Sequence, residues 1–390
     1  MKILMIAPEP VFEPRGTPFS IVGRMKTLSD MGHEVDLVTY PIGQDIPFPR
    51  VRFLRTCRIP GIRKIKIGPS LAKIPLDAVL SLKTVARLVA GRYDVIHSHE
   101  EAGFWGVILA RAVGIPHIYD MHSSLPQQLS NFEFSRSRLL VGIFEALENQ
   151  VLRLSRAVIT ICPDLDQYVS ARFPDGKSVM IENVLDYDMI FPRTDQPKDV
   201  RAELGLGRRP VALYAGTFEP YQGLDLLIES AAVAVPRFPS AVFLCVGGHP
   251  GQVEACREKT RRLGIDRAFY FTGQVSPQAV SDYVAAADLL LSPRISGTNT
   301  PLKIYSYLRS GIPVVATRLW THTQVLDDTI AVLTKPTPAD FAAGICQVLE
   351  DRPRAARIGE AARRRADEQY SEEAYREKLG RVYARVSGRG

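Results

Sequence analysis

Short apolar segments alternate with amphipathic segments along most of the chain. Between Phe19 and Met31, apolar residues recur at the three- and four-residue spacing of a helix, and Gly32 follows as a stop signal. The apolar segments are shorter than helices and match buried strands. Such alternation predicts a parallel sheet covered by helices on both faces. The strands predicted in the first half span residues 3–7, 35–40, 94–98, 115–119 and 157–161.

The alternation stops between residues 187 and 209, where Asp, Pro, Arg and Lys dominate around one short helical piece at 199–204. We interpret this segment as a linker, because a second alternating series begins at Pro210. The sequence therefore predicts two α/β domains, residues 1–190 and 198–371, with a ligand cleft between them. A basic helix from Glu372 to Val386 follows, with Tyr375, Leu379 and Val382 as its apolar positions. The strands predicted in the second half span residues 211–214, 241–246, 268–271, 288–292 and 313–316.

Composition agrees with a globular protein. Of 390 residues, 46% are hydrophobic and 23% charged, which suffices to bury two cores. No apolar run approaches the roughly 20 residues that span a bilayer, and the start lacks a signal-peptide pattern. We therefore expect a cytosolic protein, or one on the cytosolic face of a membrane. Five scattered cysteines without a CxxC pair predict ordinary reduced thiols.

The net charge of +7 is unevenly distributed. The segment from Arg50 to Lys73 contains eight basic residues and no acidic residue. Such a segment attracts phosphates on lipids, nucleic acids or nucleotides, and its interleaved apolar residues suit an anionic membrane surface. A solvated loop face is an equally good interpretation. Nucleic acid is the weakest candidate partner, because no reading motif is present and the chain has only two Trp.

Loops that leave parallel strands are the expected ligand sites. In the first loop, from Glu13 to Pro18, Gly16 allows close backbone approach, Thr17 is predicted to cap the following helix and Pro18 to be its first residue. A helix start of this kind favours a phosphate, although a plain capped turn remains an alternative. The pattern is not GxGxxG, which argues against a dinucleotide cofactor.

Two loops of the second half have similar character. Gly216 and Gly223 flank the polar residues of the loop at 215–223, which is either a phosphate loop or a structural turn. In the loop at 292–303, Thr300 is predicted as an N-cap and Pro301 as the first helical residue. Lys303 then lies in the first turn, where the helix dipole disfavours a cation. We therefore expect Lys303 to bind a ligand phosphate.

Histidines and acids cluster after two predicted strands, at residues 97–101 and 120–124. His99, Glu100 and Glu101 could bind a metal, but no other residues complete a ligand set, so hydrogen bonds to sugar hydroxyls are the better interpretation. We expect His97 to be structural. His122, at a strand end among polar residues, is a candidate functional residue.

Over nearly its whole length the chain resembles the GT-B fold retaining glycosyltransferases of family 4. The block from Pro301 to Leu308, followed by Gly311 to Val314, is the most specific part of this resemblance. The remaining motifs are Gly32–Val35, Tyr93–His97, Ile181–Asn183, Tyr214–Gly216 and Tyr221–Leu224.

The resemblance implies two facing Rossmann-like domains with a cleft between them. The C-terminal domain would bind a nucleotide-diphosphate sugar and the N-terminal domain most of a hydroxyl acceptor, while a final helix at 372–390 would cross back onto the N-terminal domain. No metal or further cofactor would be needed, since the helix at Pro301 and nearby cations would neutralise the diphosphate.

The resemblance also assigns roles to residues. His122 matches a histidine close to the donor sugar and, with Lys303, is a candidate catalytic residue; Gln274 and Val275 match a stretch that touches the base. His99, Glu100 and Glu101 become candidates for acceptor binding. The candidate donor-binding residues are Gly16, Thr17, Gly216, Thr217, Gln222, Gln274, Val275, Arg294, Thr298, Asn299, Thr300, Pro301, Leu302 and Ser306.

The chain departs from the family pattern at four positions. Two glutamates eight residues apart are replaced by Thr298 and Ser306, and an arginine and a lysine by Thr217 and Gln222. Arg294 and Lys303 could compensate for the two missing cations. The donor base, the sugar and the acceptor stay open, with a lipid-linked or envelope glycan as one possibility. The alternatives are a catalytically weak sugar-nucleotide-binding partner and a nucleotide-sugar epimerase or hydrolase.

Overall fold

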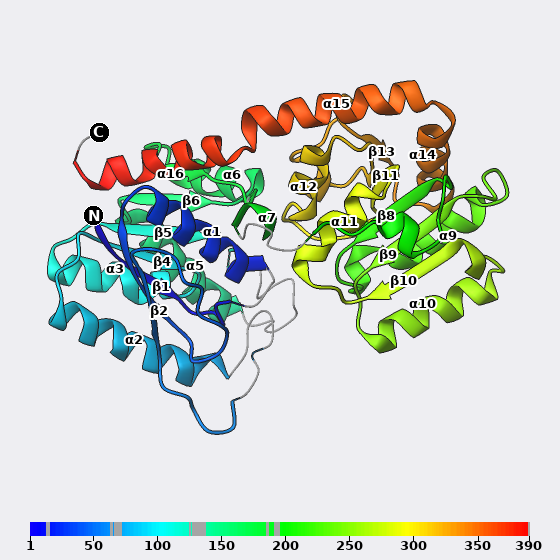
Figure 1. The fold of residues 1–390 in the computed structure, drawn as a ribbon. Helices are drawn as coiled ribbons and strands as arrows, with labels where there is room; N and C mark the ends of the chain where they lie inside the picture. The colour runs from blue at the N-terminus through cyan, green and yellow to red at the C-terminus, as the bar shows by residue number, and fades with distance from the viewer. Residues whose placement is uncertain are drawn as a thin grey trace. The chain divides into compact units, whose positions relative to one another are not determined.

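The computed structural model of the chain describes residues 1–12, 16–62, 65, 72–124, 126, 138–184, 187–190 and 196–388. These residues form two compact units (Figure 1). The first unit comprises Met1–Leu185 and Tyr375–Gly390, and the second comprises Asp186–Ala374. The chain thus returns to its first unit for its last residues.

The first unit is built on a seven-stranded sheet in the order β3-β2-β1-β4-β5-β6-β7, with neighbouring strands parallel. This is the Rossmann order, and it reverses direction between β1 and β4. Residues Ile3 to Ala7 of β1 are fully buried, because helices cover both faces of the sheet. The strands are β1 (Lys2–Ala7), β2 (Glu34–Thr39), β3 (Val51–Arg55), β4 (Val95–His99), β5 (His117–Met121), β6 (Ala157–Thr160) and β7 (Ser178–Met180).

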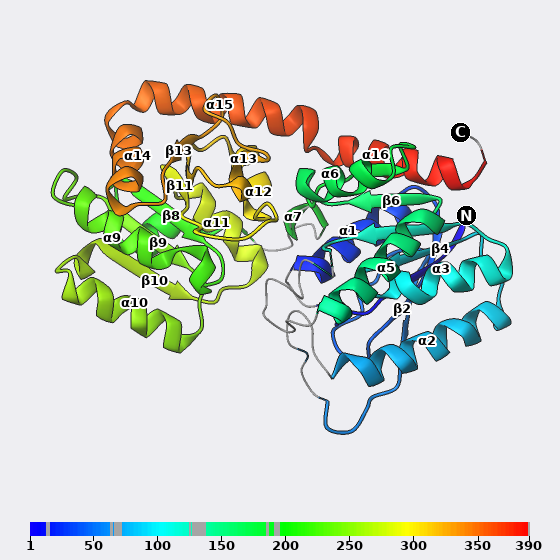
Figure 2. The same cartoon turned by 180° about the vertical axis from the view of Figure 1, so that it is seen from behind.

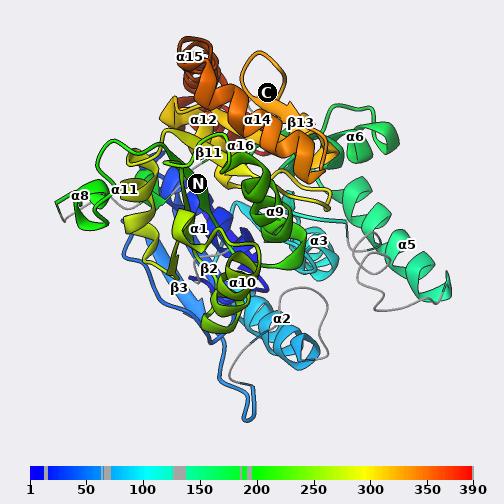
Figure 3. The ribbon, with the colours of Figure 1, turned by 90° about the vertical axis from the view of Figure 1, so that its right-hand side faces the viewer.

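Helices cover the two faces of this sheet as separate layers (Figures 1 and 2). Helices α2, α3 and α5 lie side by side on one face, and Figure 3 shows the same layer from another direction. Helix α6 shares a buried apolar cluster with α3 and α5, whereas α1 and α16 lie on the other face. The helix predicted at 372–386 is confirmed as α16, with Tyr375, Leu379 and Val382 buried. The bounds are α1 (Gly16–Asp30), α2 (Lys73–Ala90), α3 (Ala102–Val113), α5 (Arg138–Leu154), α6 (Pro163–Arg172) and α16 (Glu372–Val386).

The second unit repeats the same topology in a six-stranded sheet, in the order β10-β9-β8-β11-β12-β13. Its neighbouring strands are also parallel, and the order reverses between β8 and β11. The strands are β8 (Val211–Ala215), β9 (Val242–Val246), β10 (Phe269–Gly273), β11 (Leu289–Ser292), β12 (Val314–Thr317) and β13 (Val332–Thr334).

Helices also flank the second sheet, and α9 packs against α14. The α-helices are α7 (Tyr187–Ile190), α8 (Val200–Glu203), α9 (Leu224–Ala234), α10 (Pro250–Arg262), α11 (Val280–Ala285), α12 (Lys303–Ser310), α13 (Trp320–Thr323), α14 (Pro338–Glu350) and α15 (Arg352–Gln369). Short 3₁₀ turns are η1 (Pro220–Gln222), η2 (Asp266–Ala268) and η3 (Pro277–Ala279).

Every strand predicted from the sequence is present within about two residues. The strands β3, β7 and β13 were not predicted. Two of them have only three residues, and β3 carries Arg52 and Arg55 within its five residues, which hides its apolar alternation. Short or charged edge strands give little signal because their pairing depends on a neighbouring strand.

The basic segment at 50–73 is therefore not a plain loop. Arg52, in β3, binds Asp36 through both Nε and Nη2, at 2.6 and 2.7 Å, and Arg55 binds Asp45 at 2.6 Å. Lys73, at the start of α2, pairs with Glu101 at 2.8 Å. Acids from elsewhere thus neutralise three of the eight basic residues, while residues 63–64 and 66–71 lie outside the described part. Among the described helices, none is long and apolar enough to cross a membrane.

Candidate active site

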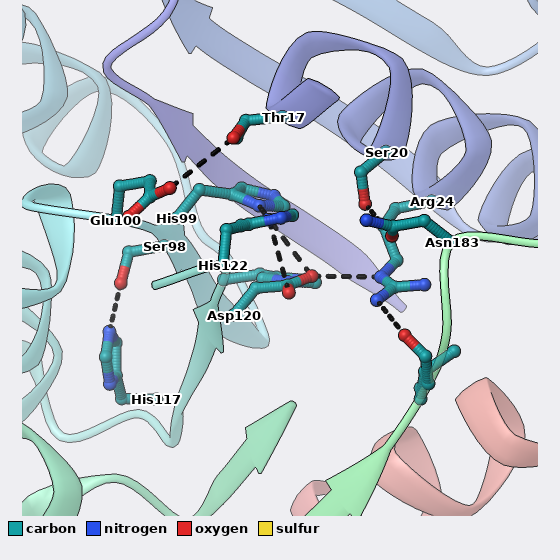
Figure 4. Close-up of polar contacts among 12 residues, drawn as sticks. Thr17, Ser20, Arg24, Ser98, His99, Glu100, His117, Asp120, His122 and Asn183 are labelled. Atoms are coloured by element: carbon teal, nitrogen blue, oxygen red, sulfur yellow. Dashed lines mark hydrogen bonds and ion pairs between the residues drawn. The ribbon is translucent and has the colours of Figure 1, made fainter. Parts of the chain in front are cut away.

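In the first unit, the topology brings the ends of three strands together. Strand order reverses between β1 and β4, so the segments that follow them diverge at the carboxyl edge of the sheet, where ligands of this fold bind. Helix α1 begins after β1, Glu100 follows β4, and His122 follows β5. Figure 4 shows that their side chains gather at this edge.

Asp120, in β5, is the centre of this cluster. Its Oδ2 accepts a hydrogen bond from Arg24 Nε at 2.9 Å and lies 3.3 Å from His97 Nε2, while its Oδ1 lies 3.3 Å from His122 Nε2. Burial by itself would raise the pKa of this carboxyl, but Arg24, assisted by the histidines, holds the pKa well below its usual range. Asp120 is therefore a buried anion balanced by Arg24.

His99 and His122 form a stacked pair above Asp120. Their rings are 5.3 Å apart, and Nδ1 of His99 lies 3.0 Å from Nε2 of His122. Burial lowers the pKa of His122 to about 4 and that of His99 well below its usual value. Both imidazoles are consequently neutral near pH 7, so His122 can offer one hydrogen-bond donor and one acceptor but no charge.

Glu100 and Glu101 have different environments. Glu100 has a positive φ of 47°; its Oε1 accepts from Thr17 at 3.4 Å and its Oε2 from Ser123 at 3.0 Å. Burial, together with Glu101 nearby, raises the pKa of Glu100 to about 8. Glu100 is thus mostly protonated at neutral pH and can donate a hydrogen bond. Glu101 instead holds Lys73 in an ion pair.

The predicted cap at Thr17 is wrong. Helix α1 already begins at Gly16, so Thr17 and Pro18 lie in its first turn, and the Thr17 hydroxyl donates to Glu100. Thr17 thus binds Glu100, which is distant in the sequence, and not the backbone of its own helix as the sequence suggested. Residues 13–15 of this loop lie outside the described part of the chain.

His97, His99 and Asp120 are close enough to hold an ion, with ligand atoms within 4.8 Å of one another. Glu100 and Glu101 do not belong to this group. The Arg24 guanidinium already binds Asp120 Oδ2, and His97 Nδ1 lies 2.7 Å from the Tyr383 hydroxyl. A divalent cation would have to share its carboxylate with a buried guanidinium, so the group suits a positioning network better than a metal site.

In the second unit, glycines shape the loops at the corresponding reversal point. Gly216, directly after β8, has φ +153°, and a Cβ there would lie 3.1 Å from Lys303 Nζ. Gly223 has φ +78°, and a Cβ would lie 1.9 Å from the Pro293 carbonyl oxygen. The loops after β8 and β11 therefore touch, and only glycine permits this approach.

Lys303, the first residue of α12, has its ammonium group beside Gly216. Nζ is buried, lies 3.8 Å from the Tyr214 ring centroid, and has no hydrogen-bond partner in the described part of the chain. Burial, assisted by Arg294, lowers its pKa to about 7. A buried amine without a carboxylate partner is a strong candidate to receive an anion.

Arg294 organises the loop that precedes α12. Its Nε donates to Ser296 O at 2.9 Å and its Nη1 to Asn299 O at 3.0 Å, while its guanidinium lies 5.1 Å from the Tyr221 ring centroid. The neighbouring Thr298 O accepts from Gln324 Nε2 at 2.6 Å. Arg294 therefore holds the loop in shape as well as adding positive charge beside Lys303.

The predicted start of α12 is wrong by two residues. The helix begins at Lys303, Leu302 is its N-cap, and no side chain caps it. The N–H groups of Ile304 and Tyr305 donate three residues back, to Pro301 and Leu302, so the turn is tighter than an α-helix. The Thr300 hydroxyl is buried without a partner among the described residues.

The other candidate donor-binding residues of the second unit lie on α12, on η1, in the loop after β8 and after β10. Ser306 Oγ donates to Lys303 O within α12, and Gln222 closes η1 with its Oε1 unpaired in the described part. Thr217 O accepts from Tyr214 Oη at 2.6 Å. Gln274 and Val275 follow the outermost strand β10, which the whole width of β9 separates from β8. Their assignment to the base stays a prediction.

Sequence reasoning missed the residues that support these groups. Arg24 was overlooked although it lies between Ile21 and Leu28 on the apolar stripe of α1, where a charge requires a buried partner. His322 is also buried, 2.8 Å from Ser292 Oγ, and burial lowers its pKa to about 4. The hydrogen bonds that Tyr375 and Tyr383 form could not be predicted, because their partners, Arg24 and His97, are more than 280 residues away.

The chain is similar to known glycosyltransferases over its full length. It is 25% identical to the phosphatidyl-myo-inositol mannosyltransferase of Mycolicibacterium smegmatis, covering 100% of this chain and 95% of that one. It is 27% identical to the D-inositol 3-phosphate glycosyltransferase of Thermobispora bispora, covering 89% and 84%.

Solved structures agree with this similarity. HepE of Anabaena in complex with UDP matches with a TM-score of 0.75 at 20% identity, covering 98% of this chain and 100% of that one. Sucrose-phosphate synthase of Thermosynechococcus elongatus matches with a TM-score of 0.78 at 19% identity, and each chain is fully covered. The predicted GT-B fold class is confirmed by these neighbours and by the two parallel-sheet α/β units.

Two family models match successive parts of the chain. The glycosyl transferase 4-like domain matches residues 22–183, and the model described as glycosyl transferases group 1 matches residues 209–351. Together they cover most of both units. The chain therefore belongs to the family 4, group 1 glycosyltransferases.

Proposed function

We propose that this glycosyltransferase moves a sugar from a nucleotide-diphosphate sugar to a hydroxyl acceptor with retention of anomeric configuration, without a metal ion. The observation that carries the donor assignment is the buried Lys303 ammonium beside the Gly216 turn, which has no carboxylate partner among the described residues. A diphosphate supplies the missing counter-charge. The solved complexes of HepE with UDP and with UDP-glucose support a donor of this class.

The barrier to transfer lies in breaking the sugar–phosphate bond while negative charge builds on the leaving diphosphate. A preorganised cation in a water-poor pocket stabilises that charge without reorganising. Because Lys303 has a pKa of about 7 in the unliganded protein, a bound dianion raises that pKa and keeps the amine protonated. Lys303 and Arg294 would thus take the role that a divalent cation has in other transferases.

The sugar C1–O bond to the phosphate breaks as the acceptor oxygen bonds to C1 from the same face. The acceptor proton passes to an oxygen of the leaving phosphate, so no protein nucleophile is required. We assign neutral His122 to a hydroxyl of the transferred sugar, with Asp120 fixing its ring. His99, Glu100 and Glu101 are assigned to the acceptor, and protonated Glu100 can donate to an acceptor oxygen.

A lipid-linked acceptor is the class we favour. The exposed face of α2 carries Ile74, Leu82, Val85 and Val89, and Val89 is 84% exposed. Apolar side chains aligned at helical spacing on an exposed face are typical of contact with a membrane surface. The similarity to a phosphatidyl-myo-inositol mannosyltransferase supports the same class of acceptor and a hexosyl donor.

A thermal-shift panel of UDP-, GDP-, ADP- and TDP-sugars, with and without EDTA, tests the proposal. Binding to the native state raises the melting temperature, so we expect one donor class to give a shift that survives EDTA. That donor is then incubated with candidate acceptors. A glycosylated acceptor supports transfer, whereas free sugar or an epimerised donor identifies a hydrolase or an epimerase. The absence of any shift from folded protein would overturn the donor assignment.

A further inference from the structure

The first unit contains a cavity of about 650 Å³ that the proposed reaction does not use. It lies at the amino end of β5, where His117 lines it, whereas His122 follows the opposite end of the same strand. Five strand residues separate these ends by roughly 16 Å. The cavity is therefore separate from the candidate active site.

The lining of this cavity is strongly basic. Its charged side chains come from the ends of α3 and α5, from the starts of β6 and β7, and from α16. They comprise five basic residues and one acid, Asp175. The basic residues are Arg111, Arg153, Arg156, Lys177 and Arg385.

The charge of the cavity is largely uncompensated. Asp175 pairs with Lys177 at 3.2 Å, while none of the four arginines has a carboxylate partner among the described residues. In the part of the chain that the structure describes, the guanidinium groups of Arg156 and Arg385 bond to backbone oxygens. His117 adds no charge, because burial lowers its pKa to about 3 and its two nitrogens contact Ser98 and Ser155.

We propose that this cavity binds a phosphate-bearing anion. Guanidinium groups present paired N–H donors that match phosphate oxygens, and several like charges around one cavity create a positive potential that attracts an anion. The cavity volume suits a small ligand. The inference is independent of the donor assignment, since Lys303, the residue that carries that assignment, belongs to the other unit.

A lipid headgroup and a soluble polyphosphate share this chemistry. Beside Arg111 on α3, Ile108 is 57% exposed and Val113 is 48% exposed. Apolar side chains next to a basic cavity match a lipid whose phosphate enters the cavity while its chains stay in the membrane. The experiment therefore uses one probe for each source.

The test compares two variants with the same change of charge. Arg111→Gln/Arg153→Gln alters the cavity, and Arg262→Gln/Arg357→Gln alters exposed residues of α10 and α15. Pyrophosphate binding is measured by calorimetry, and sedimentation is measured with vesicles of phosphatidylglycerol and phosphatidylcholine and with vesicles of phosphatidylcholine alone. Binding of pyrophosphate at the Lys303 loop is common to both variants, so the difference between them reports on the cavity.

We expect the cavity variant to bind one probe at least about 10-fold more weakly than the control variant, the loss of two charge-assisted contacts. Loss confined to phosphatidylglycerol vesicles identifies a lipid headgroup, and loss confined to pyrophosphate identifies a soluble phosphate. Equal binding of both probes by the two variants would overturn the proposal, as would the absence of binding in the unmodified protein.

Discussion

The Arg24 guanidinium donates from Nε to Asp120 Oδ2 over 2.9 Å, and neither side chain is exposed to solvent. Its Nη1 donates to the Tyr375 hydroxyl on α16 and its Nη2 to Ile181 O at 3.1 Å. Figure 4 shows this ion pair beneath the histidines. Because Asp120 also contacts His122, one buried charge pair links the C-terminal helix to the candidate catalytic histidine.

Replacing Arg24 by Met leaves Asp120 as an uncompensated buried charge. We expect the free energy of unfolding of the first unit to fall by about 3–5 kcal/mol, the usual cost of breaking a buried ion pair. Trp105 lies in α3 of this unit, so urea unfolding followed by fluorescence in a Trp320→Phe background reports on it. Arg92→Met, at an exposed position, is the control. A loss below about 1 kcal/mol would show that Asp120 does not depend on Arg24.

The titration of the Lys303 amine should make donor binding depend on pH. Burial, with Arg294 nearby, lowers the pKa of the free amine to about 7, and a diphosphate binds its protonated form. The protonated fraction of the free protein falls from about one half at pH 7 to about one hundredth at pH 9, so the donor Kd should rise by up to about 50-fold over this range. Calorimetry with the donor found by thermal shift measures this change.

Three variants test the role of Lys303. Lys303→Met should bind donor weakly with little pH dependence, whereas Lys335→Met, at an exposed position of the same unit, should behave as the unmodified protein. Lys303→Ala should lower turnover by about 100-fold or more while the protein stays folded. Near-normal turnover of that variant would remove Lys303 from the mechanism.

Glu100 predicts that stability falls as pH rises. Burial, with Glu101 nearby, raises its pKa to about 8, against about 4.5 when unfolded, so the folded protein keeps a proton that the unfolded chain loses. The stability that the proton on Glu100 contributes is fully present below pH 4.5 and is lost as the pH rises through 8. Glu100→Gln should melt at nearly the same temperature as the unmodified protein at pH 5 but roughly 4 °C or more higher at pH 9.

Melting curves of Glu100→Gln at a series of pH values check this sign. Glu145→Gln replaces an exposed carboxylate on α5 and should show no such divergence. A constant difference between Glu100→Gln and the unmodified protein from pH 5 to pH 9 would mean that Glu100 is ionised throughout.

The close contact of Gly223 with Pro293 should couple the loops after β8 and β11. Alanine there would adopt an unfavourable φ of +78° and place its Cβ 1.9 Å from Pro293 O, so Gly223→Ala should cost about 1–3 kcal/mol and weaken donor binding. Gly251→Ala is the matched control, since its Cβ would meet no atom within 4 Å in α10. Urea unfolding and calorimetry measure both variants. Unchanged donor affinity in Gly223→Ala would separate these loops from the donor site.

Much of the fold was predictable because buried parallel strands are continuous apolar segments. The segment Val211–Ala215 is apolar throughout, and it forms β8 as expected. Strand order could not be predicted, since it depends on which strands pair across the sheet. The caps predicted at Thr17 and Thr300 were wrong, since the Thr17 hydroxyl binds Glu100, which is distant in the sequence, and α12 begins at Lys303.

By itself, the sequence determined the two α/β units, the glycine-rich turns and the unusual placement of Lys303, because these depend on residue type and short-range spacing. Only the tertiary structure decided that Arg24 balances Asp120, that Tyr375 and Tyr383 reach this group from α16, and that four arginines surround one cavity. These relationships join residues far apart in the chain, and their energies arise from burial and charge proximity, which exist only once the sheets have formed.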